Sequence, residues 1–162
     1  MVQNEGVPST EYRPFFLYLA YTTPHAELLV PEDSIFLSYK GRFKETPFVK
    51  NKSGSNRHND FGAYNSQPYP NAAYATCISH QDMCIGKIIE LLKKSGLYEN
   101  TVIMFSSDNG PANEGGINPY FFNSSGGLRG IKRDLYEGGI REPFIVSWAG
   151  KIKPGQVSNH IS

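Results

Sequence analysis

The stretch TVIMFSSDNG, residues 101–110, decides the fold class of this chain. Its β-branched and apolar first half predicts a buried strand over 101–106, and the Ser-Asp-Asn-Gly that follows predicts the turn that ends it. Similar apolar runs stand at 15–21, FFLYLAY, and at 143–148, PFIVSW. The sequence therefore predicts three strands, the first of them buried on both faces.

A helix is predicted between the first two of these strands. It begins around Asn71, directly after Pro70, and its apolar residues recur close to the i, i+3, i+4, i+7 spacing of a buried helix face. Lys93, Lys94 and Gly96 mark its end. A strand, a long crossover with a helix, a strand, a glycine-rich loop and a strand follow the order of an α/β fold with a mainly parallel sheet flanked by helices. Ligands of such sheets bind beyond the carboxyl ends of the strands.

Residues 31–70 are predicted to form a long surface excursion. The segment is polar, with Asn and Ser gathered between positions 51 and 59, and it offers only a short helical candidate at 35–39. Loops of this length are usually functional or mobile.

The charge balance excludes two classes of partner. The chain has 162 residues, with 16 Lys plus Arg against 15 Asp plus Glu and a formal net charge of +1. This balance lacks the electrostatic footprint of a protein that binds nucleic acid or an anionic membrane surface. No apolar run approaches the roughly 20 residues that span a bilayer. The first residues lack the basic and apolar regions of a secretory signal, so we expect either a cytoplasmic protein or a true N-terminus that lies upstream.

Cys77 and Cys84 are predicted to be reduced packing residues. Seven positions apart on a helix, their backbones lie about 10 Å apart at a rise of about 1.5 Å per residue. That separation exceeds the roughly 7 Å limit for a disulfide. A zinc site is also disfavoured, because there is no third cysteine and no nearby pair of ligands.

Asp108 and Asn109 stand just past the 101–106 strand, where a carboxylate and an amide oxygen can point into the cleft at the edge of the sheet. Two adjacent oxygen donors suit Ca²⁺, which takes six to eight oxygen ligands. The alternative is that Asp-Asn-Gly is turn chemistry alone. His25 follows the 15–21 strand and is either a group that contacts an anion or protonates a leaving group, or a solvated loop residue.

The glycine-rich stretch 126–141, GGLRGIKRDLYEGGIR, is the densest candidate region. Its five glycines allow close backbone approach to a ligand. Glu137 and Arg141, spaced i, i+4, are predicted to form an ion pair that fixes the loop, the alternative being a mobile and solvated basic loop. The stretch contains neither G-x-x-x-x-G-K-[ST] nor G-x-G-x-x-G, so it is not a phosphate loop of the nucleotide-binding type. Four side chains in it supply cations, of which at least one is expected to face an oxyanion: Arg129, Lys132, Arg133 and Arg141.

Together these segments resemble the sulfatases, the arylsulfatase branch of the alkaline phosphatase superfamily. The matching motifs are Pro24-His25, AAYA and DMCIG in the helix at 72–75 and 82–86, SSDNG at 106–110, and LRGIK at 128–132 followed by EGGIREP at 137–143. KETPF at 44–48 resembles bacterial members of the family. The resemblance covers about residues 15 to 157 and implies part of an alkaline-phosphatase-like sandwich.

The resemblance implies the hydrolysis of sulfate esters on Ca²⁺, with a hydrated formylglycine nucleophile made from the Cys or Ser of C/S-x-P/A-x-R. Asp108 and Asn109 match a pair of metal ligands, and Asp108 also matches a residue that helps to activate the nucleophile. Lys132 matches the lysine that binds the sulfate and the ester oxygen. His25 matches a histidine near the leaving group, so Lys132 and His25 are both expected to bind substrate and to act in catalysis.

The 162 residues contain no C/S-x-P/A-x-R, and SWAGK at 147–151 is a near miss with Lys in place of Arg. We therefore expect residues 1–162 to be a partial sulfatase catalytic domain, without the nucleophile region and the C-terminal subdomain, and inactive alone. The resemblance implies a periplasmic or secreted intact enzyme that acts on a sulfated small molecule or glycan.

Two alternatives stay open at this point. One is a phosphodiesterase or phosphatase of the same superfamily, which needs a Thr or Ser nucleophile and usually a second metal. The other is a non-catalytic glycan-binding module built on the 10 Tyr and 10 Phe of the chain.

Overall fold

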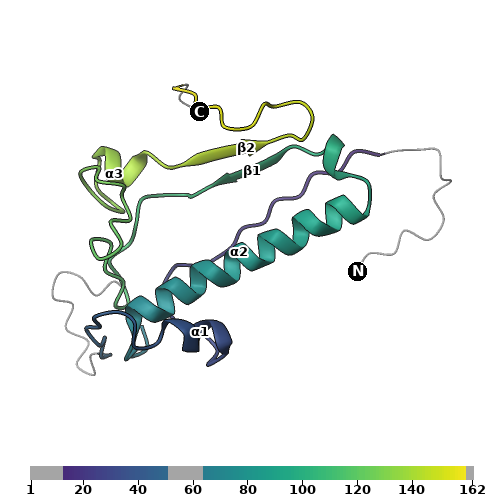
Figure 1. Ribbon diagram of the computed structural model, residues 1–162. Helices are drawn as coiled ribbons and strands as arrows, with labels where there is room; N and C mark the ends of the chain where they lie inside the picture. Colours follow the sequence, from purple (N-terminus) through teal and green to yellow (C-terminus); the bar gives the residue numbers. More distant parts are fainter. Residues whose placement is uncertain (1–12, 51–63, 160–162) are drawn as a thin grey trace.

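The computed structural model describes residues 13–50 and 64–159 and arranges them as one long helix beside a pair of strands (Figure 1). In Figure 1 the strands run alongside the helix, and the loops between the two layers gather at one end. No helix in the described part of the chain has the length and apolar character needed to cross a membrane. The elements in chain order are α1 (Ser34–Tyr39), α2 (Pro70–Lys94), η1 (Tyr98–Asn100), β1 (Ile103–Ser106), α3 (Glu137–Ile140) and β2 (Phe144–Ser147).

The long helix α2 confirms the predicted helix and begins with Pro70 in its first turn. The residue before it, Tyr69, provides no side-chain cap. Instead, the carboxylate of Glu45 accepts hydrogen bonds from the backbone N–H groups of Asn71 and Ala72, both at 2.9 Å. The free N–H groups of the first turn are thus satisfied by a side chain from the preceding segment.

The core lies where α1 and the first half of α2 meet, and it consists of Leu28, Phe36, Ala72, Ala73, Cys77 and Ile117. The helix α1 fits the short candidate expected at 35–39, and Asp33 caps it by accepting from the N–H groups of Ile35 and Phe36. Because Phe36 belongs to the core, the segment 31–70 is not entirely a surface excursion. Its polar stretch at 51–63 lies outside the described residues. Cys77 is buried and Cys84 is half-buried, and both are free thiols, as predicted.

The two strands pair antiparallel, with Ile103 opposite Ser147 and Ser106 opposite Phe144. A mainly parallel sheet is therefore not confirmed within the described residues. The segment that joins the strands contains only the single-turn α3 and no long crossover helix, so the chain re-enters the sheet at the end where it left.

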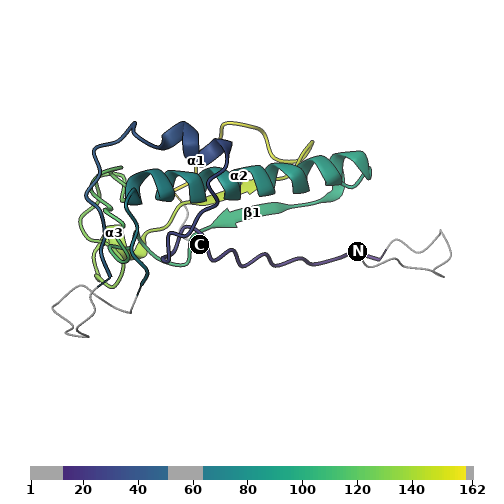
Figure 2. The same cartoon turned by 90° about the horizontal axis from the view of Figure 1, so that it is seen from below.

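The prediction of a strand at 15–21 is wrong for the described residues. These residues run extended (Figure 2) but belong to no sheet, and the backbone hydrogen bond found there joins Tyr21 N to Leu19 O within the segment itself. Phe16 is 91% exposed and Tyr18 is 79% exposed, so the segment is not buried on both faces. A strand exists only through a neighbour that pairs with it, and the described residues offer none to this segment.

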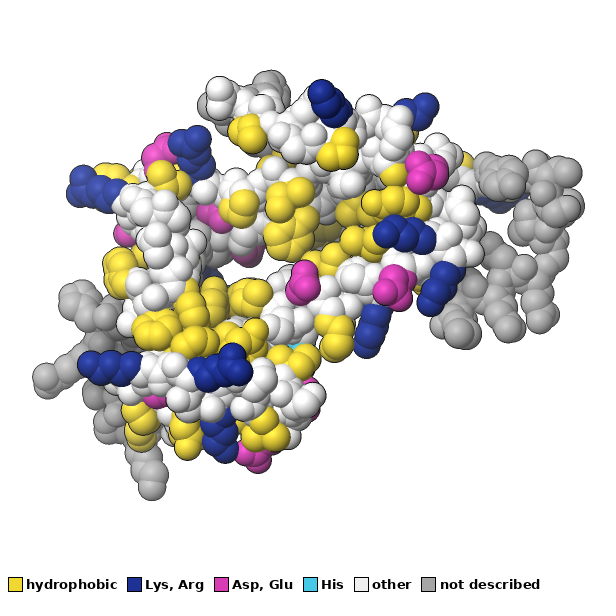
Figure 3. All heavy atoms as spheres, in the orientation of Figure 1, with side chains coloured by type: hydrophobic (Ala, Val, Ile, Leu, Met, Phe, Trp, Pro, Cys, Tyr) yellow, Lys and Arg dark blue, Asp and Glu magenta, His cyan; other side chains and the backbone are white. Residues whose placement is uncertain are grey.

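Apolar side chains are also exposed on the strands (Figure 3). In Figure 3 apolar side chains gather between α2 and the strand layer. The exposed apolar residues of the strands include Met104, Phe105, Phe144 and Ile145. The described part of the chain therefore leaves much of its apolar surface uncovered, while the loop end next to the small core holds the candidate site.

Candidate functional site

Residues 128–136, the loop that carries Lys132 and is called the Lys132 loop below, are fixed by backbone contacts to two neighbouring segments. The N–H of Lys132 donates to Pro111 O at 3.0 Å, and the N–H of Gly138 donates to Arg129 O at 2.7 Å. The N–H of Gly110 donates to Gly139 O at 3.1 Å. The turn after β1, the Lys132 loop and α3 therefore form one backbone-on-backbone assembly.

Three glycines make this assembly possible because their backbones approach other backbones too closely for a side chain. A Cβ at Gly110 would overlap Gly138 O, one at Gly138 would overlap Gly130 O, and one at Gly139 would overlap Asp134 O. The Glu-Gly-Gly of α3 is thus a packing requirement of the Lys132 loop.

The i, i+4 ion pair expected in α3 is present, with Arg141 Nη1 donating to Glu137 Oε2 at 3.2 Å. Both side chains are more than half exposed, and exposed pairs of this kind contribute little to stability. The contacts that visibly hold the loop are those of Gly138 and Gly139, so a supporting role for Glu137 and Arg141 stays a prediction.

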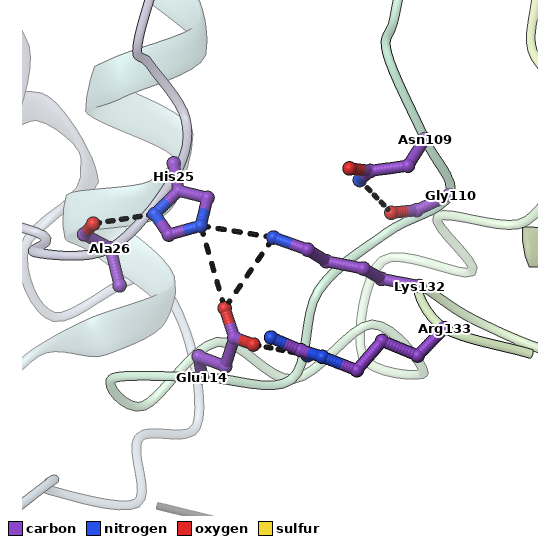
Figure 4. Close-up of polar contacts among 7 residues, drawn as sticks. All are labelled: His25, Ala26, Asn109, Gly110, Glu114, Lys132 and Arg133. Carbon is purple, nitrogen blue, oxygen red and sulfur yellow. Dashed lines mark hydrogen bonds and ion pairs between the residues drawn. The ribbon is translucent and has the colours of Figure 1, made fainter. Parts of the chain in front are cut away.

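The side chains of Lys132 and His25 lie next to each other at the end of the molecule where the loops gather (Figure 4). Lys132 Nζ lies 3.0 Å from His25 Nε2. The other ring nitrogen of His25, Nδ1, donates to Ala26 O at 2.6 Å. Because a carbonyl oxygen only accepts, the hydrogen in this bond lies on Nδ1. The bond fixes the ring so that Nε2 faces Lys132.

Glu114 completes this cluster and was missed by the sequence reasoning. Its side chain is 1% exposed, and its Oε2 lies 3.5 Å from His25 Nε2 and 3.7 Å from Lys132 Nζ. Its Oε1 forms an ion pair with Arg133 Nη1. Figure 4 shows the carboxylate enclosed by these three side chains.

Gly115 and Gly116 bring Glu114 to this position. Both have positive φ, 58° and 93°. A Cβ on Gly115 would lie 2.7 Å from Ala26 Cβ, and one on Gly116 would lie 2.7 Å from Phe48 Cβ. The Glu-Gly-Gly at 114–116 is therefore held tightly against the segment that carries His25, and an acidic residue directly before two adjacent glycines is the sequence signal for it.

Asp108 and Asn109 lie outside this cluster. Asn109 Nδ2 donates to Gly110 O at 2.9 Å, and Ser107 Oγ donates to Asn109 O at 2.9 Å, both of which are turn contacts. Asp108 is exposed and lies near Glu142. Burial, and then the negative charge of Asp108, raise the pKa of Glu142.

The oxygen atoms around Asp108 are of the kind that a hard cation prefers, but too few of them lie together to hold one. Glu142 Oε1 is buried without a hydrogen-bond partner among the described residues, so a carboxylate oxygen beside Asp108 has no donor there. Within residues 13–50 and 64–159 no group of three or more His, Cys, Asp or Glu side chains is arranged to hold a metal ion. Asp108 and Asn109 are thus too few to hold a hard cation by themselves.

Comparison with known proteins shows which family this chain resembles. The family model described as Sulfatase matches residues 7–162. The uncharacterized sulfatase YdeN of Escherichia coli K12 is 33% identical over 151 residues, which cover 93% of this chain and 22% of that protein. The N-acetylgalactosamine-6-sulfatase of Mus musculus is 31% identical over 153 residues, which cover 91% of this chain and 22% of that protein.

A similar solved structure is that of Ps i-CgsB in complex with k-i-k-neocarrahexaose, at 30% identity and a TM-score of 0.58. The similarity covers 87% of this chain and 24% of the solved chain. The chain thus spans about a fifth of the length of the curated relatives it matches. The family and this neighbour imply an alkaline-phosphatase-like α/β fold, and the chain belongs to the sulfatase family.

Proposed function

We propose that this chain forms part of a sulfatase catalytic domain in which Lys132 and His25 receive the sulfate group of an ester that the whole enzyme hydrolyses. The observation that carries the proposal is the 3.0 Å contact between Lys132 Nζ and His25 Nε2. The two residues come from the two motifs that the family resemblance assigns to the sulfate and to the leaving group. Their meeting in one cluster supports a shared task.

The cluster has the chemistry that sulfuryl transfer requires. The Lys132 ammonium offsets negative charge on the sulfate oxygens. The bond from His25 Nδ1 to Ala26 O keeps Nε2 turned toward Lys132 and toward any oxygen bound beside it. A proton held between Nε2 and Nζ is then available to the alcohol oxygen that departs.

A bound Ca²⁺ would be held in part by Asp108 and Asn109, and it would supply further positive charge to the sulfate oxygens. The support from this chain is its donor chemistry, an exposed carboxylate beside a second carboxylate with an unpartnered oxygen. Because Ca²⁺ takes six to eight oxygens, other ligands must come from outside the described residues.

The nucleophile must also come from elsewhere, because the 162 residues contain no C/S-x-P/A-x-R in which formylglycine forms. The 162-residue polypeptide alone is then inactive, since Lys132 and His25 do not replace an attacking group.

A sulfated carbohydrate is the substrate class that we propose. Its support is that one relative is named for N-acetylgalactosamine-6-sulfate chemistry and that the solved neighbour binds a neocarrahexaose. A purely glycan-binding role has less support, because several of the aromatic rings near the core pack on one another. Phe43 stacks on Tyr39 at 5.9 Å between ring centroids, and Phe122 stacks on Tyr74 at 5.8 Å.

Hydrolysis of 4-nitrocatechol sulfate tests the proposed function. The complete open reading frame that encodes this chain is expressed with a formylglycine-generating enzyme, and the 162-residue polypeptide is assayed beside it. We expect turnover from the former and none from the latter. Turnover by the 162-residue polypeptide, retained in Lys132→Ala, would show that the proposed division of the site is wrong.

A phosphate ester control separates the second enzymatic alternative. The same preparations are assayed with 4-nitrophenyl phosphate. Sulfate-ester turnover that exceeds phosphate-ester turnover supports the proposal, and the reverse order favours a phosphatase of the same superfamily.

A further inference from the structure

The carboxylate of Glu114 is buried in a way that only ion pairs compensate. Its side chain is 1% exposed, and neither oxygen has a hydrogen-bond partner among the described residues. Burying a carboxylate without compensation is costly. The compensation comes from the Arg133 guanidinium at Oε1 and from Lys132 Nζ at 3.7 Å from Oε2. His25 Nε2 lies 3.5 Å from the same Oε2.

Glu114 therefore contacts the two atoms that the proposed function assigns to sulfate. The Lys132 side chain keeps 17% exposure and that of His25 keeps 45%, whereas Glu114 keeps 1%. Solvent therefore reaches Lys132 and His25 but not the carboxylate, and a second anion from solution can approach these two side chains. The two anions then share the positive charge of Lys132.

We propose that Glu114 is the internal counter-ion of this anion site. It is a positioning residue that keeps Lys132 and His25 together while no anion is bound, and it weakens the binding of free sulfate, the product. The inference rests on the proposed function for the identity of that anion. With Lys132 and Arg133 charged, the negative charge of Glu114 reduces the local charge from +2 to +1. Removal of that charge should therefore raise the affinity of the site for anions.

The sign of one change in affinity tests this role. Inorganic sulfate is titrated at constant ionic strength into the 162-residue chain and into Glu114→Gln, with binding followed by NMR shifts of the His25 ring. Charges about 4 Å apart interact strongly even when partly screened, so the negative charge of Glu114 repels a bound sulfate and weakens the pull of Lys132 on it. We therefore expect Glu114→Gln to bind sulfate about tenfold more tightly. Glu114→Asp, which keeps the charge, should stay within about twofold of the wild-type affinity.

A merely structural role for Glu114 predicts the opposite sign. If Glu114→Gln keeps the helical circular dichroism signal and binds sulfate more weakly or equally well, the counter-ion role is wrong. The same holds if neither the wild type nor this variant binds sulfate.

A second variant keeps the inference testable if Glu114→Gln does not fold. Arg133→Gln removes one partner of Glu114 at a side chain that is 45% exposed, so Glu114 competes more strongly for Lys132. We expect sulfate binding about fivefold weaker. The matched control is Lys151→Gln, which removes one positive charge from an exposed position after β2, and it should leave the affinity unchanged. Equal effects of the two variants would contradict the inference.

The inference and the proposed function fail separately. If sulfate affinity follows these signs but the complete open reading frame product hydrolyses no sulfate ester, the counter-ion role stands and the proposed function falls. If the ester is hydrolysed but the affinities do not follow the signs, the proposed function stands and the counter-ion role falls.

Discussion

Lys132 Nζ lies 3.0 Å from His25 Nε2, although 107 positions separate the two residues in the chain. Neither side chain is brought there by a long helix or by a strand. His25 is oriented by its own Ala26 carbonyl, and Lys132 is carried by a loop whose backbone is bonded to Pro111. The site therefore depends on the packing of irregular backbone segments.

Lys132 should dominate anion binding by this chain. Lys132→Ala removes a positive charge in direct contact with His25 and leaves Glu114 closer to an uncompensated state, so we expect sulfate binding at least about tenfold weaker. The measurement is a titration of sulfate followed by NMR. Lys151→Ala, which removes the same charge from an exposed position after β2, is the control and should bind as the wild type does. Affinity within about twofold of wild type in Lys132→Ala would rule out this assignment.

The glycines of α3 should be necessary for the fold of the loop. Gly138→Ala places a Cβ on the carbonyl oxygen of Gly130, and backbone groups cannot yield as a flexible side chain does. We expect a loss of about 1–3 kcal/mol in the free energy of unfolding, together with weaker sulfate binding. Denaturant titration and the sulfate assay measure the two effects.

Gly86→Ala is the matched control for this prediction. Gly86 is exposed in the middle of α2, and a Cβ there meets nothing within 4 Å. Alanine is the better helix former, so this variant should be more stable by about 0.5–1 kcal/mol. Destabilisation of similar size at both positions would mean that close packing does not explain the Glu-Gly-Gly motif.

Local patterns in the sequence predicted the features that depend on neighbouring residues in the chain. The apolar spacing, Pro70 and the terminal lysines were sufficient to predict α2. The order of short motifs suggested a family resemblance, and through it Lys132 and His25 as separate site residues. The strand at 15–21 was wrong because a strand depends on a neighbour, which an apolar run by itself does not supply. The antiparallel pairing of β1 with β2 was missed because strand direction depends on the connection between them.

Glu114 shows why the site was predicted only in part. Its neighbours in space, His25 and Lys132, lie far from it in sequence, and a single acidic residue carries no periodicity that marks it as buried. The close fits of Gly115 against Ala26 and of Gly116 against Phe48, which hold Glu114 in place, are visible only in the folded chain.

Glu45 should stabilise α2 from outside the helix. Its two carboxylate oxygens accept the N–H groups of Asn71 and Ala72 at 2.9 Å, so Glu45→Ala leaves both donors without this partner. We expect a loss of about 1 kcal/mol, a typical effect of removing an N-cap. Thermal unfolding by circular dichroism at 222 nm measures it. Glu90→Ala, which removes an exposed carboxylate 3.9 Å from Lys94, should cost no more than about 0.5 kcal/mol, and an equal loss in the two variants would argue against the capping role.

Asp33 should make α1 sensitive to acid. The N–H of Phe36 is the main cause that holds the pKa of Asp33 below its ordinary value, and the contact with His80 Nε2 at 2.8 Å adds to it. A carboxyl whose pKa is lower in the folded state contributes stability above its unfolded pKa of about 3.8. That contribution should be lost as the pH falls through the lower, folded pKa.

Asp33→Asn tests this sign because it keeps an acceptor oxygen for the N–H groups of Ile35 and Phe36 while it removes the titrating charge. We expect the wild type to melt at a higher temperature than Asp33→Asn at pH 6, and the difference to shrink as the pH falls well below the unfolded pKa of about 3.8. The melting temperatures are measured from pH 2 to pH 6 by circular dichroism. A difference that stays constant over this range would mean that the charge of Asp33 does not stabilise α1, because only the ionised form distinguishes the two side chains.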